Sequence, residues 1–590
     1  MTTAWAPVAI APPFAVHGEL TADGQHIILM AAGDAATAAD HLSLLTPAFT
    51  SVKGQGALKV RVSWAAVVQL ASQLGKTWVP GPRLKAWITE QFVQRFTVPE
   101  LTSKTRADAP PPMLHQVVGA RMIAATGRAL VFDDPGTGKT LTSIMGVLEL
   151  WERGRLPIGP VLVVCPASVQ DPWIEAWSRW TDKTAVAWRG TKARRAKLVG
   201  TADVYVASYG TASRDADPHT MPEKNPLEVL APVCVIIDET HKLKNADSLQ
   251  SRAVRRLAKN AQSVIALSGT PITHNAIDLH PTLNALEPWA WPSKERFVTR
   301  YVQLSSGDYQ DKVLGLNKDR EPEFRDALKG QYRRLAKEAV LDLPPKVYSR
   351  RDVDLPPAAR KAYDAMERTM LAALDNGQEL DAMSEVTQML RLLQLSCASA
   401  DVELEHTGEF DDYGEEKVIT HVNLRDPSWK VDEFIDVLNE RPGKQVVAFA
   451  PSRQLIELAG RRAANAGYRV GYVVGGQSAK TRTAQVDAFQ AGELDVLCVT
   501  TSAGGVGITL TAASTAVFIQ RPWSYVEASQ AEDRCHRIGS ERHSSIEIID
   551  IVARNTIDSR VREVLHHKSG ALAELLEDPN IVRQCLGGAR

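Results

Sequence analysis

Residues 131–140 read VFDDPGTGKT, and residues 233–245 read VCVIIDETHKLKN. The first stretch is an apolar strand followed by a Gly-rich turn that ends in Lys139 and Thr140, and the second is an apolar strand that ends in the acidic pair Asp238 and Glu239. A phosphate-binding turn and a downstream acidic pair are what a protein needs to hold a nucleoside triphosphate with its magnesium ion and to cleave the terminal phosphate. The two stretches therefore predict an ATP-binding parallel α/β domain.

The Gly-rich turn can surround a phosphate group because of its backbone geometry. Gly136 and Gly138 can take backbone angles that are closed to residues with a Cβ, so successive N–H groups turn toward the β- and γ-phosphates. The helix expected after the turn points its positive end at the same anion. Lys139 supplies a mobile positive charge, and Thr140 supplies a hard oxygen ligand for Mg²⁺. Asp133 stands where the strict G-x-x-x-x-G-K-[ST] pattern has its first glycine, so the motif is a variant, and alone it would fit a structural turn before a helix equally well.

The acidic pair follows a run of five apolar residues, VCVII. Asp238 and Glu239 are therefore expected at the carboxyl edge of a buried strand, where parallel α/β sheets bind their ligands. An acidic loop after a core strand is the alternative. The upstream phosphate-binding turn at a plausible spacing favours the functional interpretation.

Composition limits the class of protein. At 590 residues and 44% hydrophobic, the chain has apolar material for three or four domains. Its 68 Lys and Arg residues almost balance its 69 Asp and Glu residues, which excludes a generally basic nucleic-acid coat and leaves only local clusters for contact with a phosphate backbone. The scattered cysteines, with Cys165, Cys234 and Cys498 in strand-like runs, predict buried thiols in a reducing compartment.

No targeting or membrane segment is expected. The N-terminus MTTAWAPVAIAPPFAV has no basic flank and is interrupted by proline, and no apolar run approaches membrane-spanning length. We therefore expect a cytoplasmic protein without a membrane partner. The compact size and the lack of eukaryotic accessory modules hint at a bacterial or viral source.

The pattern along the chain predicts an α/β fold with two similar parallel-sheet lobes, helical insertions and a small N-terminal α+β domain. Apolar strand-like runs alternate with helix-like segments from Met113, helical periodicity replaces them from about Trp291, and an acidic segment, expected to be a solvated loop or hairpin, precedes a second alternating region. The expected parts are an accessory domain of unknown role (1–101), a linker (102–112), the ATP-binding lobe (113–300), a helical insertion with the acidic loop (301–428), a second lobe (429–560) and a helical tail (561–590).

A series of ordered motifs gives a resemblance to a known family. The motifs are MLHQVVGARMI, VFDDPGTGKT, VLVVCPASVQDPWIEAWSRW, VYVASYGT, DETHKLKN, ALSGTPITHN, RRLAKEAVLDLPPK, SWKVDEFIDVL, TTSAGGVGITLTAAS, SQAEDRCHRIGS and ARNTIDSRV. In this order they resemble a Swi/Snf-type ATPase, the DNA-translocating branch of the superfamily-two DEAD/DEAH helicases, from about Met113 to Leu575. The resemblance implies that both lobes are RecA-like.

The sequence departs from the family pattern at a few positions. Pro135 and Thr137 replace the usual Met and Leu, Thr240 replaces Ala, and Ser540 stands where Gln is usual. None of these changes removes a charge or a hydroxyl that the chemistry requires, which indicates a distant or compact member. No chromatin-reading module is recognisable, so nucleosome remodelling is not expected.

The resemblance implies roles for the residues of an ATP site. Lys139, Glu239, Arg534 and Arg537 would be catalytic, with Glu239 activating the attacking water. Thr140 and Asp238 would hold Mg²⁺. The residues expected to bind ATP are Gln116, Asp134, Pro135, Gly136, Thr137, Gly138, Lys139, Thr140, Asp238, Gly507 and Gln530.

The spacing of the two arginines also supports a role in the ATP site. Arg534 and Arg537 lie three residues apart, which on a helix places both on one face. Two guanidinium groups can spread positive charge over a phosphoryl group in its transition state. A surface helix with salt bridges is the alternative, and Gln530 together with the GGVGI turn favours the functional interpretation.

For DNA, the resemblance implies sequence-independent contacts to the phosphate backbone. The residues concerned are Ser208, Tyr209, Ser268, Gly269, Thr500, Thr501 and Gly505. Trp523 is expected to pack in its motif. A basic cluster adds a candidate duplex surface, with a solvated basic face as the alternative: Arg333, Arg334, Lys337, Lys346, Arg350 and Arg351.

These features together predict a DNA-stimulated ATPase that moves on duplex DNA as its two lobes open and close with ATP and Mg²⁺. Three alternatives remain: a strand-separating DNA or RNA helicase, the motor of a restriction, defence or fork-remodelling complex, and a nucleotide-switched scaffold without catalysis. A monomer is favoured, and the N-terminal domain is the expected site for a protein partner.

Overall fold

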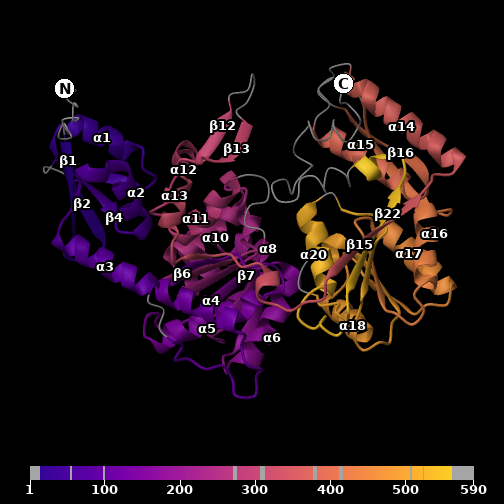
Figure 1. Ribbon diagram of the computed structural model, residues 1–590, viewed down its shortest axis with the longest axis horizontal. Coiled ribbons are helices and arrows are strands. Elements are labelled where there is room, and N and C mark those ends of the chain that lie inside the picture. The colour runs from indigo at the N-terminus through magenta and orange to yellow at the C-terminus, as the bar shows by residue number, and fades with distance from the viewer. Residues whose placement is uncertain are drawn as a thin grey trace, which may run out of the picture. The chain divides into compact units, whose positions relative to one another are not determined.

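The computed structural model divides the chain into two compact units (Figure 1). The structure describes residues 14–52, 56–96, 100–269, 276–305, 312–375, 382–410, 416–504, 508–522 and 524–560. Unit 1 contains residues 1–134 and 138–336, and unit 2 contains residues 337–590, with which residues 135–137 are grouped. None of the described helices is long and apolar enough to cross a bilayer.

Unit 1 begins with a small α+β domain. Its strands are β1 (Phe14–Leu20), β2 (His26–Gly33), β3 (Phe49–Val52), β4 (Ala57–Arg61) and β5 (Trp78–Pro80), in the sheet order β3-β4-β2-β1-β5. Its helices are α1 (Ala35–Ser43), α2 (Trp64–Leu74) and α3 (Pro82–Phe96). Alternate residues of β1, such as Phe14 and Val16, are buried against Leu42 and Leu70 from the helices, as expected for a strand with one face on a core.

Buried polar contacts join this domain to the rest of unit 1. The Thr46 hydroxyl donates to the Ala290 carbonyl at 2.8 Å, and the Gln69 amide oxygen accepts from the Thr46 N–H at 2.9 Å. The Ser72 hydroxyl donates to Glu323, which also accepts from the Arg300 guanidinium at 2.7 Å. The domain is therefore an integral part of unit 1.

A seven-stranded parallel sheet is the centre of unit 1, in the order β14-β6-β11-β10-β7-β9-β8. The strands are β6 (Arg128–Val131), β7 (Val161–Cys165), β8 (Ala185–Trp188), β9 (Val204–Ser208), β10 (Cys234–Asp238), β11 (Ser263–Leu267) and β14 (Tyr332–Arg333). The surrounding helices include α4 (Leu114–Thr126), α5 (Lys139–Glu152), α6 (Gln170–Trp180), α7 (Lys192–Ala196), α8 (Tyr209–Asp215), α9 (Pro226–Val229), α10 (Leu249–Asn260) and α11 (His280–Leu286).

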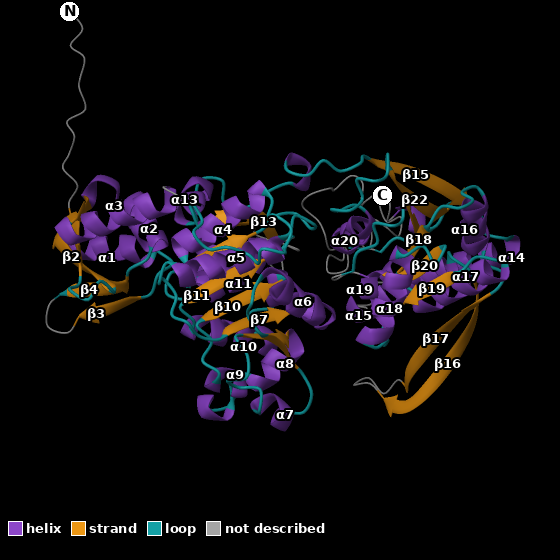
Figure 2. Ribbon diagram, turned by 90° about the horizontal axis from the view of Figure 1, so that it is seen from below, coloured by secondary structure: helices purple, strands orange, loops and turns teal. Residues whose placement is uncertain are grey.

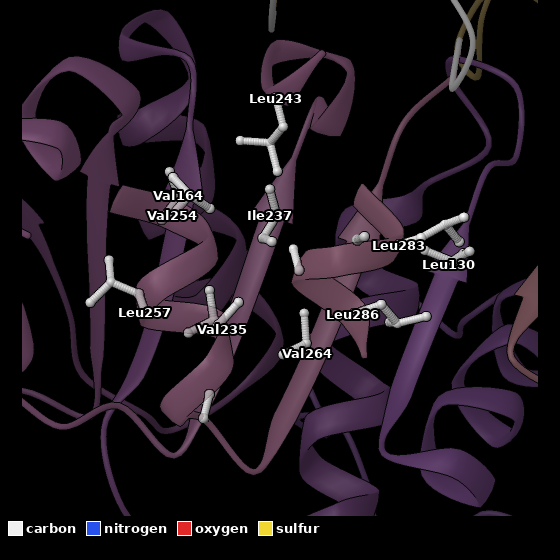
Figure 3. Packing of buried hydrophobic residues seen from close by; sticks show 14 of the residues in the cluster. Leu130, Val164, Val235, Ile237, Leu243, Val254, Leu257, Val264, Leu283 and Leu286 are labelled. Carbon is white, nitrogen blue, oxygen red and sulfur yellow. The ribbon is translucent and has the colours of Figure 1, made fainter. Parts of the chain in front are cut away.

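The continuous apolar runs of the sequence become the central strands of this sheet. Val235 and Ile237 of β10 are fully buried, and Leu257 of α10 and Leu283 of α11 belong to the same core cluster (Figure 3). Strands that are covered on both faces need apolar side chains at every position. The carboxyl edge of this sheet carries the candidate site.

The remaining elements of unit 1 follow the sheet. They are α12 (Lys294–Tyr301), β12 (Val302–Ser305), β13 (Lys312–Leu316) and α13 (Glu321–Ala327). Aromatic rings of Trp291, Phe297, Tyr301 and Phe324 pack against one another there, with centroids 5.1–6.2 Å apart.

Unit 2 is built on a six-stranded parallel sheet in the order β15-β22-β21-β18-β20-β19. The strands are β15 (Lys346–Val353), β18 (Val446–Ala450), β19 (Val470–Val473), β20 (Val496–Thr500), β21 (Thr515–Phe518) and β22 (Ile546–Ala553). The helices are α14 (Pro357–Asp375), α15 (Ala382–Leu395), α16 (Trp429–Asn439), α17 (Arg453–Asn465), α18 (Ala479–Gln490), α19 (Thr501–Gly504) and α20 (Tyr525–Cys535). The predicted α/β class with two parallel-sheet lobes is confirmed.

The second sheet starts earlier in the chain than the sequence predicted. Strand β15 pairs with β22 along its whole length, although its residues 346–353 fall in the segment expected to be a helical insertion. The charged pattern KVYSRRDV conceals this strand because β15 is at the edge of the sheet, where polar residues are tolerated. The expected insertion is therefore divided: residues 301–336 belong to unit 1, and residues 337–428 belong to unit 2. The acidic segment adopts the hairpin alternative, as β16 (Ser399–Phe410) and β17 (Glu416–Arg425), which form a long two-stranded ribbon (Figure 2).

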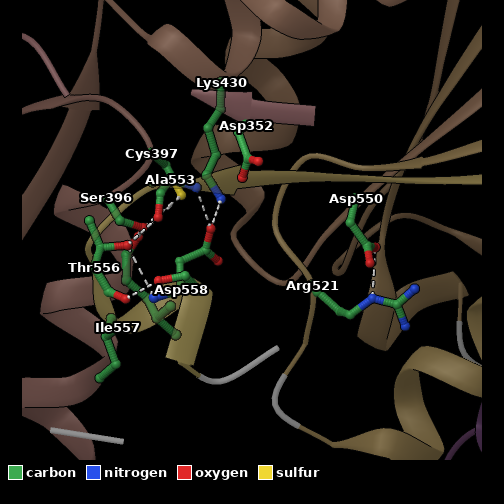
Figure 4. A network of polar contacts seen from close by, with 12 residues as sticks. Asp352, Ser396, Cys397, Lys430, Arg521, Asp550, Ala553, Thr556, Ile557 and Asp558 are labelled. Atoms are coloured by element: carbon green, nitrogen blue, oxygen red, sulfur yellow. Dashed lines mark hydrogen bonds and ion pairs between the residues drawn. The ribbon is translucent and has the colours of Figure 1, made fainter. Parts of the chain in front are cut away.

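A buried ion pair closes the core of unit 2 (Figure 4). The ammonium of Lys430, which is 0% exposed, lies 2.6 Å from the Asp558 carboxylate, and the same oxygen accepts from the Ala553 N–H at 2.9 Å. The pair joins the SWK and NTID motifs. The expected helical tail, 561–590, lies outside the described residues. All five cysteines of the described part are buried thiols, and burial raises the pKa of Cys234 and of Cys498 to about 12.

A candidate nucleotide site and a candidate nucleic-acid edge

The phosphate-binding turn lies between β6 and α5 in unit 1. Gly136 and Gly138 adopt positive φ angles of 87° and 84°, in the region that favours glycine. A Cβ at position 138 would lie 2.2 Å from the Gln116 amide nitrogen. Gln116 is thus next to the turn, held by the Met113 N–H, which donates to its side-chain oxygen at 2.9 Å. The part of Gln116 in nucleotide binding stays a prediction.

Lys139 is the first residue of α5 and turns back over the loop. Its ammonium donates to the carbonyl oxygens of Asp133 at 2.8 Å and Asp134 at 3.1 Å. Burial lowers the pKa of Lys139, while the negative charges of Glu239 and Asp238 oppose the shift. The ammonium and the acidic pair therefore act on one another in one half-buried region, where charges interact more strongly than in water.

The acidic pair lies at the carboxyl end of β10, as predicted. The Trp173 indole N–H donates to the Asp238 carboxylate at 2.8 Å, and the Tyr209 hydroxyl donates to the Asp238 carbonyl at 2.7 Å. Burial and the neighbouring Glu239 charge raise the pKa of Asp238 to about 6. A bound divalent cation would relieve both effects, so this carboxyl fits a metal ligand.

Glu239 has the left-handed backbone angle φ 55°, which is uncommon for a residue with a side chain. Its carboxylate lies 3.3 Å from His241 Nδ1, and the same nitrogen lies 3.3 Å from the Ser268 hydroxyl. His241 therefore connects the predicted base to the end of β11. The sequence analysis did not single out His241.

The predicted nucleic-acid residues of unit 1 lie at the same edge, but their side chains differ in exposure. Ser208 is half-buried and caps α8, accepting from the Thr211 N–H at 3.2 Å. Tyr209 and Ser268 are 5% and 0% exposed, and Tyr209 supports the acidic strand end instead of facing outward. Gly269 is buried beside Ser268.

Arg333 does not lie on an open basic face, which corrects the prediction. Its guanidinium contacts the Asp133 carboxylate, with Nε at 3.1 Å from the nearest oxygens, and donates to the His115 carbonyl at 2.5 Å. Asp133 is 1% exposed. The residue that departs from the strict phosphate-loop pattern is thus balanced by an arginine 200 positions later. Arg334 is exposed, and its role stays a prediction.

In unit 2 the two predicted arginines come together near the end of α20. The helix ends at Cys535, so Arg534 lies in its last turn and Arg537 just beyond it. Both guanidinium groups point their Nη1 at the Ile508 carbonyl, at 3.5 Å and 3.4 Å. Gln530 is half-buried on the same helix. The shared helical face was the wrong reason for their proximity, but the proximity itself is present.

Most of the predicted basic cluster is neutralised by carboxylates, which is a second correction. Lys337 is 5% exposed and pairs with Asp533. The Lys346 ammonium lies 2.9 Å from Glu532 and 3.2 Å from Asp533. Arg350 pairs with Asp352 and Arg351 with Glu440. Except for Asp352, which is two residues from Arg350, these partners come from distant parts of the chain, so the sequence could not reveal them.

The carboxyl edge of the second sheet has a cavity of about 380 Å³ with both apolar and polar side chains in its wall. Thr500 ends β20 at this edge, and its hydroxyl is buried without a hydrogen-bond partner among the described residues. The Gln520 side-chain oxygen, in the cavity wall, is in the same state. Thr501 donates to Glu527. The cavity is lined by Leu390, Arg391, Gln394, Pro451, Ser452, Arg453, Gln454 and Gln520.

The sequence analysis missed the polar groups of this cavity. Arg391 comes from α15 in the insertion, Arg453 from the start of α17, and Gln520 from the segment after β21. The position of Gln520, directly after an apolar strand, was the one available signal. Gly505, Gly507 and Trp523 lie outside the described residues.

Two protein-family models match the chain. A "SNF2-related domain" matches residues 115–402, and a "Helicase conserved C-terminal domain" matches residues 429–539. The chain is 26% identical over 513 residues to "DNA annealing helicase and endonuclease ZRANB3" of Mus musculus, covering 84% of this chain and 43% of that protein. It is 27% identical over 448 residues to "ISWI chromatin-remodeling complex ATPase ISW1" of Saccharomyces cerevisiae, covering 74% of this chain and 37% of that protein.

The chain spans less than half the length of these curated relatives. Among solved structures, the "Sulfolobus solfataricus SWI2/SNF2 ATPase core in complex with dsDNA" matches at 21% identity and a TM-score of 0.36, covering 83% of this chain and 99% of that one.

Proposed function

The chain belongs to the Swi/Snf-type ATPases of helicase superfamily two, and from this membership we propose that it is a DNA-stimulated ATPase that moves along duplex DNA. It is an ATP-hydrolysing enzyme. The observation that carries the proposal is the grouping of Lys139 and the Asp238–Glu239 pair at one half-buried sheet edge, with the Lys139 ammonium hydrogen-bonded to carbonyl oxygens of the phosphate loop. This is the arrangement that phosphoryl transfer to water requires.

The residues of unit 1 would share the work in a defined way. Lys139 would hold the β- and γ-phosphates, and the N-terminal end of α5 would add its positive partial charge. Thr140 and Asp238 would hold Mg²⁺, which supplies charge neutralisation at the phosphates. Glu239 would orient the attacking water and accept its proton.

Unit 2 would complete the site when the units close on ATP. Arg534 and Arg537 would then stabilise the negative charge that develops on the transferred phosphoryl group. Arginines that act only in the closed state make turnover depend on what drives closure. We propose that duplex DNA drives it, through contacts to its phosphate backbone.

The candidate DNA-contacting groups lie at the carboxyl edges of the two sheets. In unit 2, Arg391 and Arg453 line the cavity with Gln520, whose side-chain oxygen has no partner among the described residues, and the Thr500 hydroxyl ends the neighbouring strand β20. Such groups suit contacts to phosphate and sugar, which fix register without reading sequence. His241, between Glu239 and Ser268, offers a route from the edge of unit 1 to the catalytic base.

ATP turnover across a panel of nucleic acids tests this proposal. We expect duplex DNA to stimulate turnover more than single strands or RNA, and Lys139→Ala to abolish it. Triplex displacement without fork unwinding would support translocation over strand separation. Equal turnover with and without any nucleic acid would contradict the proposal.

Strand annealing is a second candidate, because one relative that covers 84% of this chain is named a DNA annealing helicase. An enzyme of this kind would rewind a partly melted duplex in an ATP-dependent way. A gel assay with a bubble substrate distinguishes it: rewinding that needs ATP and Lys139 supports annealing, whereas turnover without rewinding supports translocation alone.

A further inference from the structure

We propose that residues 332–346, which join the two units and which we call the strap, position both halves of the ATP site. Arg333 at one end holds the phosphate loop of unit 1, and Lys337 and Lys346 hold the arginine-bearing helix of unit 2. This inference rests on the proposed function, because it concerns how the groups of that same site are kept in place.

The first end of the strap extends the sheet beside the phosphate loop. Strand β14 runs parallel to β6, and the Phe132 N–H donates to the Arg333 carbonyl at 2.8 Å. Two residues on, the Asp134 N–H donates to the Leu335 carbonyl at 2.9 Å. Since Lys139 in turn donates to the carbonyl of Asp134, the backbone of the strap supports the residue that the catalytic lysine contacts.

The Arg333 side chain ties the two sides of the nucleotide site together. It contacts the Asp133 carboxylate at the entry to the loop and donates to the carbonyl of His115, the residue before Gln116, which is expected to bind ATP. Position 119 is glycine, and a Cβ there would lie 2.6 Å from the Arg333 Nη1. Helix α4 therefore leaves room for this guanidinium, which fixes both loop and helix.

The second end of the strap is anchored on the two acids that precede Arg534. Lys337 pairs with Asp533, and Lys346 lies 2.9 Å from Glu532. All four side chains are at most 15% exposed. In addition, the Pro344 carbonyl lies 2.8 Å from His536 Nε2. The residues on both sides of Arg534 are thus held by the strap.

The strap is too short to separate its two anchors freely. Three residues lie between Arg333 and Lys337, and four peptide units span at most about 14 Å when extended. A rotation of the units must therefore bend these few residues or load an anchor. Rigid anchors at both ends make the phosphate loop and the arginine helix respond to the same hinge.

Arg333, Lys337 and Lys346 are positioning residues, since they act through Asp133, Glu532 and Asp533. The two ends act on different quantities. Loss of the Arg333 anchor loosens ground-state binding of the nucleotide. Loss of the Lys346 anchor misplaces groups that work in the transition state, which lowers kcat without raising KM.

The test compares Arg333→Gln, Lys346→Met and Lys346→Arg with the wild type at saturating duplex DNA. We expect Lys346→Met to lower kcat by about 10- to 100-fold with the KM for ATP changed less than about threefold, and Lys346→Arg to restore most of the rate. Arg333→Gln should weaken ADP binding, measured by calorimetry without DNA, by about tenfold. Arg441→Gln is the control, because Arg441 forms a comparable half-buried pair with Glu547 in unit 2.

A fifth variant distinguishes loss of positioning from simple misfolding. Insertion of Gly-Ser between Leu335 and Ala336 leaves every anchor intact but slackens the strap, and we expect it to lower kcat while ADP affinity stays at the wild-type value. Rates are expressed per active site by titration with a tight-binding nucleotide. A wild-type kcat for the insertion variant would overturn the proposal. A wild-type kcat per active site for Lys346→Met would overturn it as well. The ADP measurement needs no DNA response, so it separates failure of the strap from failure of the proposed function.

Discussion

The two parallel sheets of this protein carry different candidate functional groups, and different interactions hold those groups in place. In unit 1 the acidic pair is fixed by neutral donors, the Trp173 indole and the Tyr209 hydroxyl. In unit 2 the arginine helix is fixed by buried ion pairs, with Lys337 and Lys346 against Glu532 and Asp533. The comparison shows that a parallel sheet can hold functional side chains through neutral donors or through ion pairs that the segment joining the units supplies.

The difference has an energetic consequence. Removing a neutral hydrogen-bond donor from a buried carboxyl typically costs about 1–3 kcal/mol. Removing one partner of a buried ion pair costs about 3–5 kcal/mol, because the other charge is left uncompensated. We therefore expect the functional groups of unit 2 to be more sensitive to single changes in their supports than those of unit 1.

The largest effect is expected in unit 1 itself. Lys139→Ala should lower kcat/KM for ATP by at least about 10³-fold, because it removes the charge that faces the phosphates. Steady-state phosphate release with duplex DNA measures it, and Lys192→Ala, an exposed lysine of α7, is the control. A Lys139→Ala variant with wild-type activity would contradict the assignment of the phosphate-binding site to unit 1.

The arginine pair gives the matching experiment in unit 2. Arg534→Ala and Arg537→Ala should each lower kcat by about 10²- to 10³-fold while ADP affinity stays within about threefold, since arginines that act in the transition state contribute little to ground-state binding. Rapid-quench turnover and calorimetry measure the two quantities. Equal losses of kcat and of ADP affinity would instead make these arginines ordinary binding groups.

The next comparison is between a buried and an exposed set of ion pairs, both in unit 2. Lys430→Met leaves the Asp558 carboxylate buried beside an apolar side chain, so we expect a loss of about 3–5 kcal/mol confined to unit 2. Arg462→Gln removes two exposed ion pairs, with Asp426 and Asp432, and should cost about 1 kcal/mol. Urea unfolding followed by protease sensitivity of each unit measures both changes. Similar losses for the two variants would show that the burial of the pair does not matter.

The pH dependence of stability gives a comparable effect in unit 1. Burial lowers the pKa of His280 from 6.5 to about 4, so the unfolded chain binds a proton that the folded chain does not. Stability is therefore full above pH 6.5 and decreases as the pH falls toward 4, by up to about 3 kcal/mol. Urea midpoints of the wild type and His280→Asn at pH 7 and pH 5 measure it. A difference between the two proteins that does not change with pH would contradict the assignment.

Sequence alone predicted the parts of the site that are local. The phosphate loop, the acidic pair after β10 and the strand–helix alternation depend on neighbouring residues, so spacing and apolar runs are sufficient to find them. Arg333 was misassigned for the opposite reason. A cluster of basic residues in the sequence looks like an exposed surface. Its acidic partners are distant in the chain: Asp133, 200 positions from Arg333, and Asp533, which pairs with Lys337.

The missed strand β15 has the same physical cause. Its charged residues pair with acids from β15 itself and from α16 and its C-terminal end, and edge position hides the alternation that identifies a strand. The cavity residue Arg391 was missed because α15 belongs to an insertion that carries no recognised motif. Long-range pairing, and not local propensity, decides these positions.

The central claim is that the two units contribute opposite halves of one DNA-responsive ATP site. The most direct measurement is multiple-turnover phosphate release by the wild type and by Arg534→Ala, each with and without a long duplex. We predict that duplex DNA stimulates the wild type by at least about tenfold and leaves Arg534→Ala near its unstimulated rate. Stimulation of both proteins by the same factor would contradict the account, because it would show that DNA acts on unit 1 without the arginines of unit 2.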